Sequence, residues 1–222
     1  MKKLLTGIVM AVCAQVASAA VVYNSWTSNE GQSGNYILTI TENAGALDFH
    51  LTVDPWNAEA LGLFVNLGDV DVGGLTLSNV TPAGRVLVTA KDVQIANGNL
   101  CGNGCNLNGL KIPAQAGDDG EWEMVFGLGN TGYDGIQTFS FTVESDQIDL
   151  TEDMLGIVGI RAQQLCDGSQ TLPGGACGGS DKSWGLPVVP TTFQSTVSEP
   201  AMIGLLGLGL AGIAAARRRR VA

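Results

Sequence analysis

The chain has 222 residues, with 11 basic and 21 acidic side chains and a single histidine. Six of the basic residues lie in the first three and last six positions, so residues 20–198 carry five basic and 20 acidic side chains, a formal net charge of −15. A surface of this sign repels nucleic acid and anionic lipid and attracts cations, so we exclude DNA and RNA as partners.

The first residues have the layout of a secretory signal. Two lysines precede the apolar range 4–16, and Ala17 and Ala19 supply the small residues of a signal-peptidase site. The apolar range is too short for a transmembrane helix. We therefore expect residues 1–19 to be a signal peptide that directs export through the Sec pathway and is cleaved after Ala19.

Residues 20–197 predict one all-β domain. Ranges 36–41 and 47–53 alternate apolar and polar residues, which is typical of half-buried strands, and Asn43-Ala44-Gly45 between them predicts a hairpin. Apart from a helical turn within 145–155, we find no helical period. About 11 short strands separated by turn residues predict an antiparallel β-sandwich or jelly roll. The other expected strands are 21–26, 61–67, 75–80, 85–90, 92–96, 121–128, 138–144, 157–162 and 191–197.

Two long Asn/Gly-rich ranges, 97–120 and 166–186, are predicted as loops, and they contain Cys101, Cys105, Cys166 and Cys177. An even number of cysteines in an exported chain favours two disulfides, with three possible connectivities. The spacing favours Cys101–Cys105 and Cys166–Cys177. A four-cysteine zinc site and free thiols are the alternatives, and zinc normally needs two closely spaced pairs.

Residues that could carry catalysis are few. His50 is expected on the polar face of its strand beside Asp48, and no G-x-S-x-G nucleophile motif is present. Glu121 and Glu123 are expected on one solvent-exposed strand face over a buried Trp122, without the facing geometry of glycoside hydrolysis. We therefore expect no enzyme and no resident cofactor, with a secreted hydrolase as a remote alternative.

An acidic loop is a candidate calcium site. Asp118, Asp119 and Glu121 place three carboxylates around Gly120, and Ca²⁺ prefers such oxygen ligands. No EF-hand spacing is present, so a solvated acidic loop is the alternative.

Two tryptophans are candidates for stacking on sugar rings. Trp56 follows Asp54-Pro55 in a predicted turn, and Trp184 lies in the second predicted cysteine loop. Tryptophans in turns have less core available to them than those in strands, so both are candidates for exposure. The alternative is that each fills an end of the sandwich.

The last 25 residues combine three features. The polar motif Ser198, Glu199, Pro200 is followed by the apolar range 201–216, which would span about 24 Å as a helix, slightly less than a bilayer's hydrocarbon core. An arginine cluster then follows, and it should stay in the cytoplasm as a stop-transfer signal. Its members are Arg217, Arg218, Arg219 and Arg220.

This order of motif, apolar segment and arginine cluster resembles the PEP-CTERM sorting tail of exported Gram-negative bacterial proteins, also catalogued as an "ice-binding protein C-terminal domain". The family motif usually reads Pro-Glu-Pro, and here Ser198 stands at its first position. The resemblance covers residues 198–222. It implies exosortase as the sorting partner, a transient inner-membrane anchor, and then release or attachment at the cell surface or in the extracellular matrix.

For the domain before the tail, we expect a structural or adhesive role with exopolysaccharide, as in a biofilm matrix. A carbohydrate- or calcium-binding module is the alternative. Ice binding would need a flat, regular threonine array, which Thr191-Thr192 and scattered threonine pairs do not provide.

Overall fold

The computed structural model describes residues 20–95, 101–102, 105–112, 120–130, 132–173 and 177–188. The chain divides into two compact units, Met1–Val188 and Val189–Ala222, and all described residues belong to the first. The expected signal peptide, strand 191–197 and the tail lie outside the described residues. Over the described ranges, no helix has the length and apolar character needed to cross a membrane.

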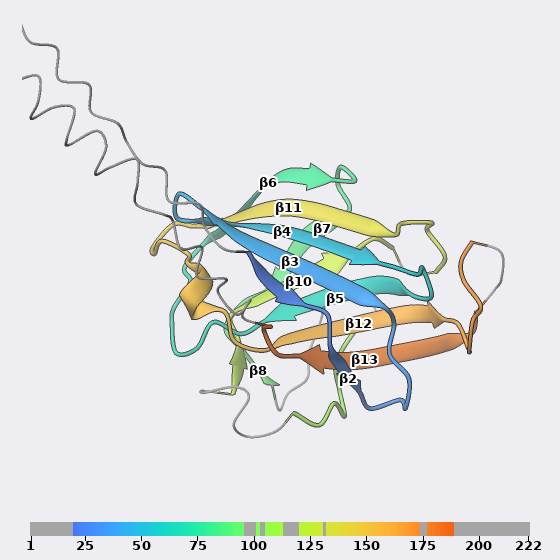
Figure 1. Ribbon diagram of the computed structural model, residues 1–222. Helices are drawn as coiled ribbons and strands as arrows, with labels where there is room; N and C mark the ends of the chain where they lie inside the picture. Colours follow the sequence, from blue (N-terminus) through green and yellow to red (C-terminus); the bar gives the residue numbers. More distant parts are fainter. Residues whose placement is uncertain are drawn as a thin grey trace, which may run out of the picture. The chain divides into compact units, whose positions relative to one another are not determined.

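The described residues form an all-β domain of antiparallel strands (Figure 1), as the sequence predicts. A five-stranded sheet has the order β1-β3-β4-β11-β6, a six-stranded sheet has the order β2-β13-β12-β5-β10-β7, and β8 pairs with β9. The strands are β1 Val21–Tyr23, β2 Trp26–Ser28, β3 Tyr36–Asn43, β4 Ala46–Val53, β5 Glu59–Val65, β6 Leu75–Thr81, β7 Val86–Ala90, β8 Val93–Gln94, β9 Glu121–Trp122, β10 Met124–Leu128, β11 Thr138–Ser145, β12 Val158–Leu165 and β13 Gly179–Gly185.

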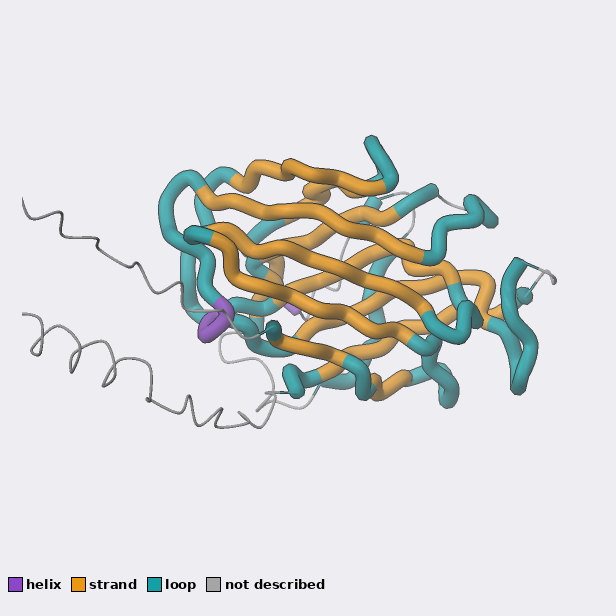
Figure 2. The backbone as a smooth tube through the Cα atoms, turned by 45° about the horizontal axis from the view of Figure 1, so that its top comes forward, coloured by secondary structure: helices purple, strands orange, loops and turns teal. Residues whose placement is uncertain are grey.

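The strands of the two sheets are drawn in orange in Figure 2. Buried side chains of both sheets form one hydrophobic cluster. Phe49 on β4 lies with its ring centroid 5.7 Å from that of Phe126 on β10, across the sheets, and 4.9 Å from that of Phe141 on β11. Leu38 and Ile40 on β3 are fully buried in the same cluster, as the alternation predicts. Each such side chain contributes about 1.5–3 kcal/mol when it is buried. The finer assignment to a sandwich or jelly roll stays a prediction.

The predicted hairpin and helical turn are both present. Asn43 pairs with Ala46, and the two loop residues Ala44 and Gly45 have φ of 53° and 85°. Positive φ at both loop residues is what a two-residue type I′ turn requires. A short 3-10 helix, η2 Glu152–Met154, provides the turn within 145–155.

The loop prediction over 166–186 is wrong for Gly179–Gly185, which forms β13 between β12 and β2. The strand lacks an apolar alternation because its buried inward positions are Asp181 and Ser183. Their polar atoms are satisfied by hydrogen bonds instead, including one from the Tyr36 hydroxyl to Asp181 at 2.8 Å. A strand of this kind is invisible to a search for alternating hydrophobicity.

Two other expected strands are interrupted. The range 21–26 divides into β1 and β2, which belong to different sheets. The range 121–128 breaks at Glu123, between β9 and β10, and the Glu123 side chain is 1% exposed. The prediction that Glu123 lies on a solvent-exposed acidic face is therefore wrong, because its carboxylate turns inward and accepts a hydrogen bond from the Leu67 N–H. Trp122 is buried, as expected.

A second hydrophobic cluster lies on the outer face of the six-stranded sheet. It includes Trp122 and Leu107, and Trp184 packs against it. Gly62 and Gly127 are direct cross-strand partners on this face, and the Cys101–Cys105 disulfide rests against them. The absence of side chains at these two positions lets the disulfide ring approach the sheet closely.

Candidate functional site

Three loops gather at one end of the strands, shown on the right in Figure 1. Their described parts are 54–58 between β4 and β5, 129–130 and 132–137 between β10 and β11, and 166–173 and 177–178 between β12 and β13. Backbone hydrogen bonds join the first to the third, because the Cys166 N–H donates to the Asn57 oxygen and the Leu172 N–H to the Trp56 oxygen, each at 2.8 Å. We call this group the end loops.

The end loops bring Trp56 and Tyr133 together. Their ring centroids are 6.2 Å apart and their planes differ by 27°, a stacked arrangement. Trp56 is half-buried and packs against a small cluster of Cys166, Leu172 and Cys177. Tyr133 is 50% exposed. The ring offered to solvent is therefore that of Tyr133, and Trp56 supports it from the protein side.

Tyr133 is a site residue that the sequence reasoning missed. The sequence around it, Gly132-Tyr133-Asp134-Gly135, is a turn composition with one aromatic residue, and both glycines have positive φ. Because the glycines lack side chains, few neighbouring atoms of this loop can cover the tyrosine ring. The signal that could have found it is an aromatic residue flanked by turn glycines.

One buried and one half-buried polar side chain fix the backbone on both sides of Tyr133. Glu59 on β5 is 1% exposed, and its Oε1 accepts hydrogen bonds from the N–H groups of Asp134 at 3.1 Å and Gly135 at 3.0 Å. Gln163 on β12 donates from Nε2 to the carbonyl oxygens of Asn130 and Gly132. Burial raises the pKa of Glu59 above its ordinary value, and the hydrogen bonds from Gly135 and Asp134 oppose that rise.

The Cys166–Cys177 disulfide lies beneath this aromatic pair. The structure forms both expected bonds, Cys101–Cys105 and Cys166–Cys177. Cys166 is fully buried, and its carbonyl oxygen accepts a 2.6 Å hydrogen bond from Gln32 Nε2. The second disulfide therefore stiffens the end loop on which Trp56 rests, so the aromatic pair sits on a fixed support.

Trp184 is placed elsewhere. It lies on β13 rather than in a loop, half-buried against the second hydrophobic cluster on the outer face of the six-stranded sheet. Its register partners, Gly159 and Thr27, belong to strands and not to the end loops. The structure therefore does not bring Trp184 and Trp56 into one site.

Of the three expected calcium ligands, the structure describes only Glu121. Glu121 is half-buried and accepts a hydrogen bond from Gln94 Nε2, whereas Asp118 and Asp119 lie outside the described residues. Within the part of the chain that the structure describes, no three His, Cys, Asp or Glu side chains are grouped as metal ligands. His50 is exposed, as expected, and its Nδ1 lies 2.8 Å from the Ser140 hydroxyl.

The expected processing residues also lie outside the described residues. They are Ala17 and Ala19 of the signal-peptidase site, Ser198, Glu199 and Pro200 of the sorting motif, and Arg217, Arg218, Arg219 and Arg220 of the stop-transfer cluster.

Comparison with known proteins gives one match. No curated protein and no solved structure matches the chain. The sequence profile of the PEP-CTERM protein-sorting motif matches residues 196–220, which include the Ser198-Glu199-Pro200 motif and the arginine cluster. The chain therefore carries a PEP-CTERM protein-sorting motif, the signal by which exported proteins are recognised by exosortase.

Proposed function

We propose that this exosortase-sorted protein serves as an adhesive component of an extracellular polysaccharide matrix, and that Tyr133, supported by Trp56, is its sugar-binding platform. The sorting motif supports export and handling by exosortase. The function of the β-domain is argued from the end loops. We further propose that its two sheets form the β-sandwich that the strand pattern predicts.

The observation that carries the proposal is a half-exposed aromatic ring on a rigid base. Tyr133 is 50% exposed, and the ring behind it, Trp56, rests on the Cys166–Cys177 disulfide and Leu172. An aromatic face offers a large apolar area at low cost in side-chain entropy, and the hydroxyl of tyrosine adds a hydrogen-bonding group. A sugar ring presents both an apolar face and hydroxyl groups, so it matches such a platform.

Loops held by a rigid scaffold are also where binding residues concentrate. The loop that carries Tyr133, residues 129–130 and 132–137, is called the platform loop. Its backbone is fixed by Glu59 and Gln163, two side chains of the six-stranded sheet. Ordering of the loop on binding is thereby largely avoided, and this lowers the entropy lost when a polymer binds.

The test is retardation of the exported protein in native gels that contain exopolysaccharide. Tyr133→Ala should abolish the retardation, and Tyr133→Phe should retain most of it because the ring is kept. Leu186→Ala is a matched control, since Leu186 is also 50% exposed but follows β13, outside the end loops. Retardation that survives Tyr133→Ala unchanged would remove the platform from the proposal. If no polysaccharide retards the wild-type protein, the adhesive role is wrong and a purely structural role is left.

A further inference from the structure

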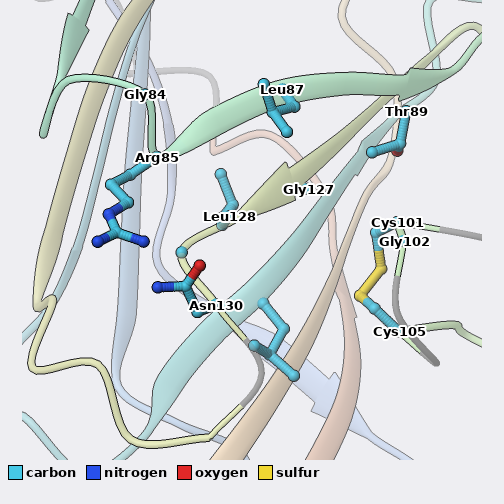
Figure 3. Close-up of a pocket in the computed structure, with 12 residues that line it drawn as sticks. Gly84, Arg85, Leu87, Thr89, Cys101, Gly102, Cys105, Gly127, Leu128 and Asn130 are labelled. Carbon is cyan, nitrogen blue, oxygen red and sulfur yellow. A yellow bond between two sulfur atoms is a disulfide. The ribbon is translucent and has the colours of Figure 1, made fainter.

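A pocket of about 100 Å³ lies beside the platform loop, on the outer face of the six-stranded sheet (Figure 3). We call it the Arg85 pocket. Arg85 and Asn130 lie at one end of it, and the Cys101–Cys105 disulfide lies at the other. Gly127 also lines the pocket, and its lack of a side chain lets the Cys101 backbone and the Thr89 side chain lie close to β10.

Two leucines that line the Arg85 pocket lie on the two strands that flank β10. Leu87 on the edge strand β7 is 62% exposed, and Leu61 on β5 is half-buried. Leu87 has the highest exposed fraction among the large apolar side chains that the structure describes as exposed. The pocket therefore combines a small apolar surface with one guanidinium and one amide.

Arg85 is the one charged residue among those that line the pocket. Over the described ranges it forms no ion pair, although residues 20–198 hold 20 carboxylate side chains and only five cationic ones. Its backbone is fixed, because its N–H donates to the Pro82 oxygen at 3.1 Å and its own oxygen accepts from the Gly129 N–H at 2.8 Å. An arginine without a carboxylate partner presents its paired N–H donors to a ligand, and these match a carboxylate in a bidentate geometry.

The pocket and the platform share one loop. Asn130, which lines the pocket, is three residues before Tyr133, and its N–H donates to Asp134 Oδ2 at 2.8 Å. Gln163 donates to the carbonyl oxygens of Asn130 and Gly132, so one side chain holds both segments. The loop that carries the Tyr133 ring therefore also carries Asn130 at one end of the Arg85 pocket.

We propose that the Arg85 pocket binds the carboxylate of a uronic acid residue, so that the polymer recognised at Tyr133 is an acidic polysaccharide. This inference rests on the proposed function and specifies its substrate class. The guanidinium binds the carboxylate, the Asn130 amide binds a ring hydroxyl, and Leu61 and Leu87 contact the apolar face of the sugar. The net charge of −15 over residues 20–198 repels an acidic polymer as it repels nucleic acid. This repulsion is screened beyond about 8 Å at physiological salt, and the direct contact with Arg85 has to outweigh what remains of it.

The experiment compares oligogalacturonate with its carboxyl-reduced counterpart, in which each carboxylate is a primary alcohol. Binding of the exported protein is measured by titration calorimetry in EDTA, which removes calcium bridges between protein and polymer carboxylates. Wild type should bind the acidic oligomer about tenfold or more tightly than the reduced one, as expected of a hydrogen bond to a charged group. Arg85→Gln should remove this preference and leave binding of the reduced oligomer unchanged.

The control for charge alone is Lys91→Gln, which removes a cation that pairs with Asp92 and does not line the pocket. It should leave the preference intact. A preference that survives Arg85→Gln, or equal binding of the two oligomers by wild type, would overturn the pocket assignment. If in that case Tyr133→Ala still abolishes binding, the proposed function stands alone. If the acidic preference depends on Arg85 but not on Tyr133, the pocket stands and the platform fails.

Discussion

The hydroxyl of Tyr36 donates a 2.8 Å hydrogen bond to the carboxylate of Asp181, 145 residues later in the chain, and so joins the two sheets through their shared interior. Asp181 is fully buried. Its oxygens also accept hydrogen bonds from Ser28, Gly34 and Ser183, so the carboxylate is surrounded by donors from three segments. Because this buried carboxylate accepts hydrogen bonds from several segments, it holds β2, β3 and β13 together.

Asp181→Ala should therefore destabilise the domain strongly. The substitution leaves several buried donors without an acceptor, each at a cost of about 1–3 kcal/mol, so we expect a loss of about 3 kcal/mol or more in the free energy of unfolding. Urea unfolding followed by tryptophan fluorescence measures this loss.

Tyr36→Phe is the matched comparison for that measurement, because it removes one donor and leaves the carboxylate with its other partners. It should cost about 1–2 kcal/mol. If Asp181→Ala costs no more than Tyr36→Phe, the carboxylate does not organise the three segments and this account of β13 is wrong.

Glu59 should make the domain less stable as pH rises through mildly acidic values. Burial raises its pKa in the folded state, so the folded chain binds this proton more tightly than the unfolded chain does. Its contribution to stability is therefore fully present below its ordinary pKa near 4.5 and is lost as pH rises through the raised folded value. Glu59→Gln, which keeps an acceptor for Asp134 and Gly135, should gain in stability relative to wild type between pH 4 and 7.

The measurement is urea unfolding of both proteins across that pH range, so that the effect of all other carboxylates cancels in the difference. Glu144→Gln, at an exposed position of β11, serves as the control and should show no such change. A constant difference between Glu59→Gln and wild type over the range would contradict the prediction.

Much of the fold follows from local patterns. β3 and β4 were predictable because Leu38, Ile40 and Phe49 alternate with polar residues and all three enter the shared cluster. The hairpin between them was marked by Gly45, which adopts a positive φ easily. Both disulfides join cysteines that are close in sequence, so their pairing also needed no knowledge of the fold.

The features that the sequence did not predict depend on contacts between residues far apart in the chain. β13 was missed because Asp181 takes the place of an apolar residue, and its partner Tyr36 lies on another sheet. Tyr133 was missed because Glu59 and Gln163 fix its loop from strands 75 and 31 residues away. The Arg85 pocket exists because β7 and β10 are neighbours and because the Cys101–Cys105 loop lies against Gly127 of β10. Sequence periodicity contains none of this information.

Gly62→Ala should displace the loop that carries the Cys101–Cys105 disulfide. An added Cβ at Gly62 would collide with the sulfur atoms of both cysteines. The Cys101 backbone lies against Gly127, the cross-strand partner of Gly62. Inserting a methyl group into such a contact costs about 1–3 kcal/mol in the free energy of unfolding. Gly178→Ala is the control, because its added Cβ would meet nothing within 4 Å. Equal thermal unfolding midpoints for the two variants would mean that the disulfide ring is not seated on the sheet.

The sorting motif predicts a specific mass for the processed protein. Export should remove residues 1–19, and exosortase should remove the segment beyond about Ser198, because the motif at 196–220 marks the tail for processing. The intact mass of protein recovered from its native host should match both losses. It should also be lower by the mass of four hydrogens until reduction, since Cys101–Cys105 and Cys166–Cys177 form disulfides.

Replacing Glu199 and Pro200 together by alanine should leave the tail attached while the loss of four hydrogens persists, which separates a sorting defect from misfolding. A wild-type mass that retains Arg217–Arg220 would show a protein that keeps its tail, and the extracellular role proposed for the domain would then have to be exercised from a membrane anchor.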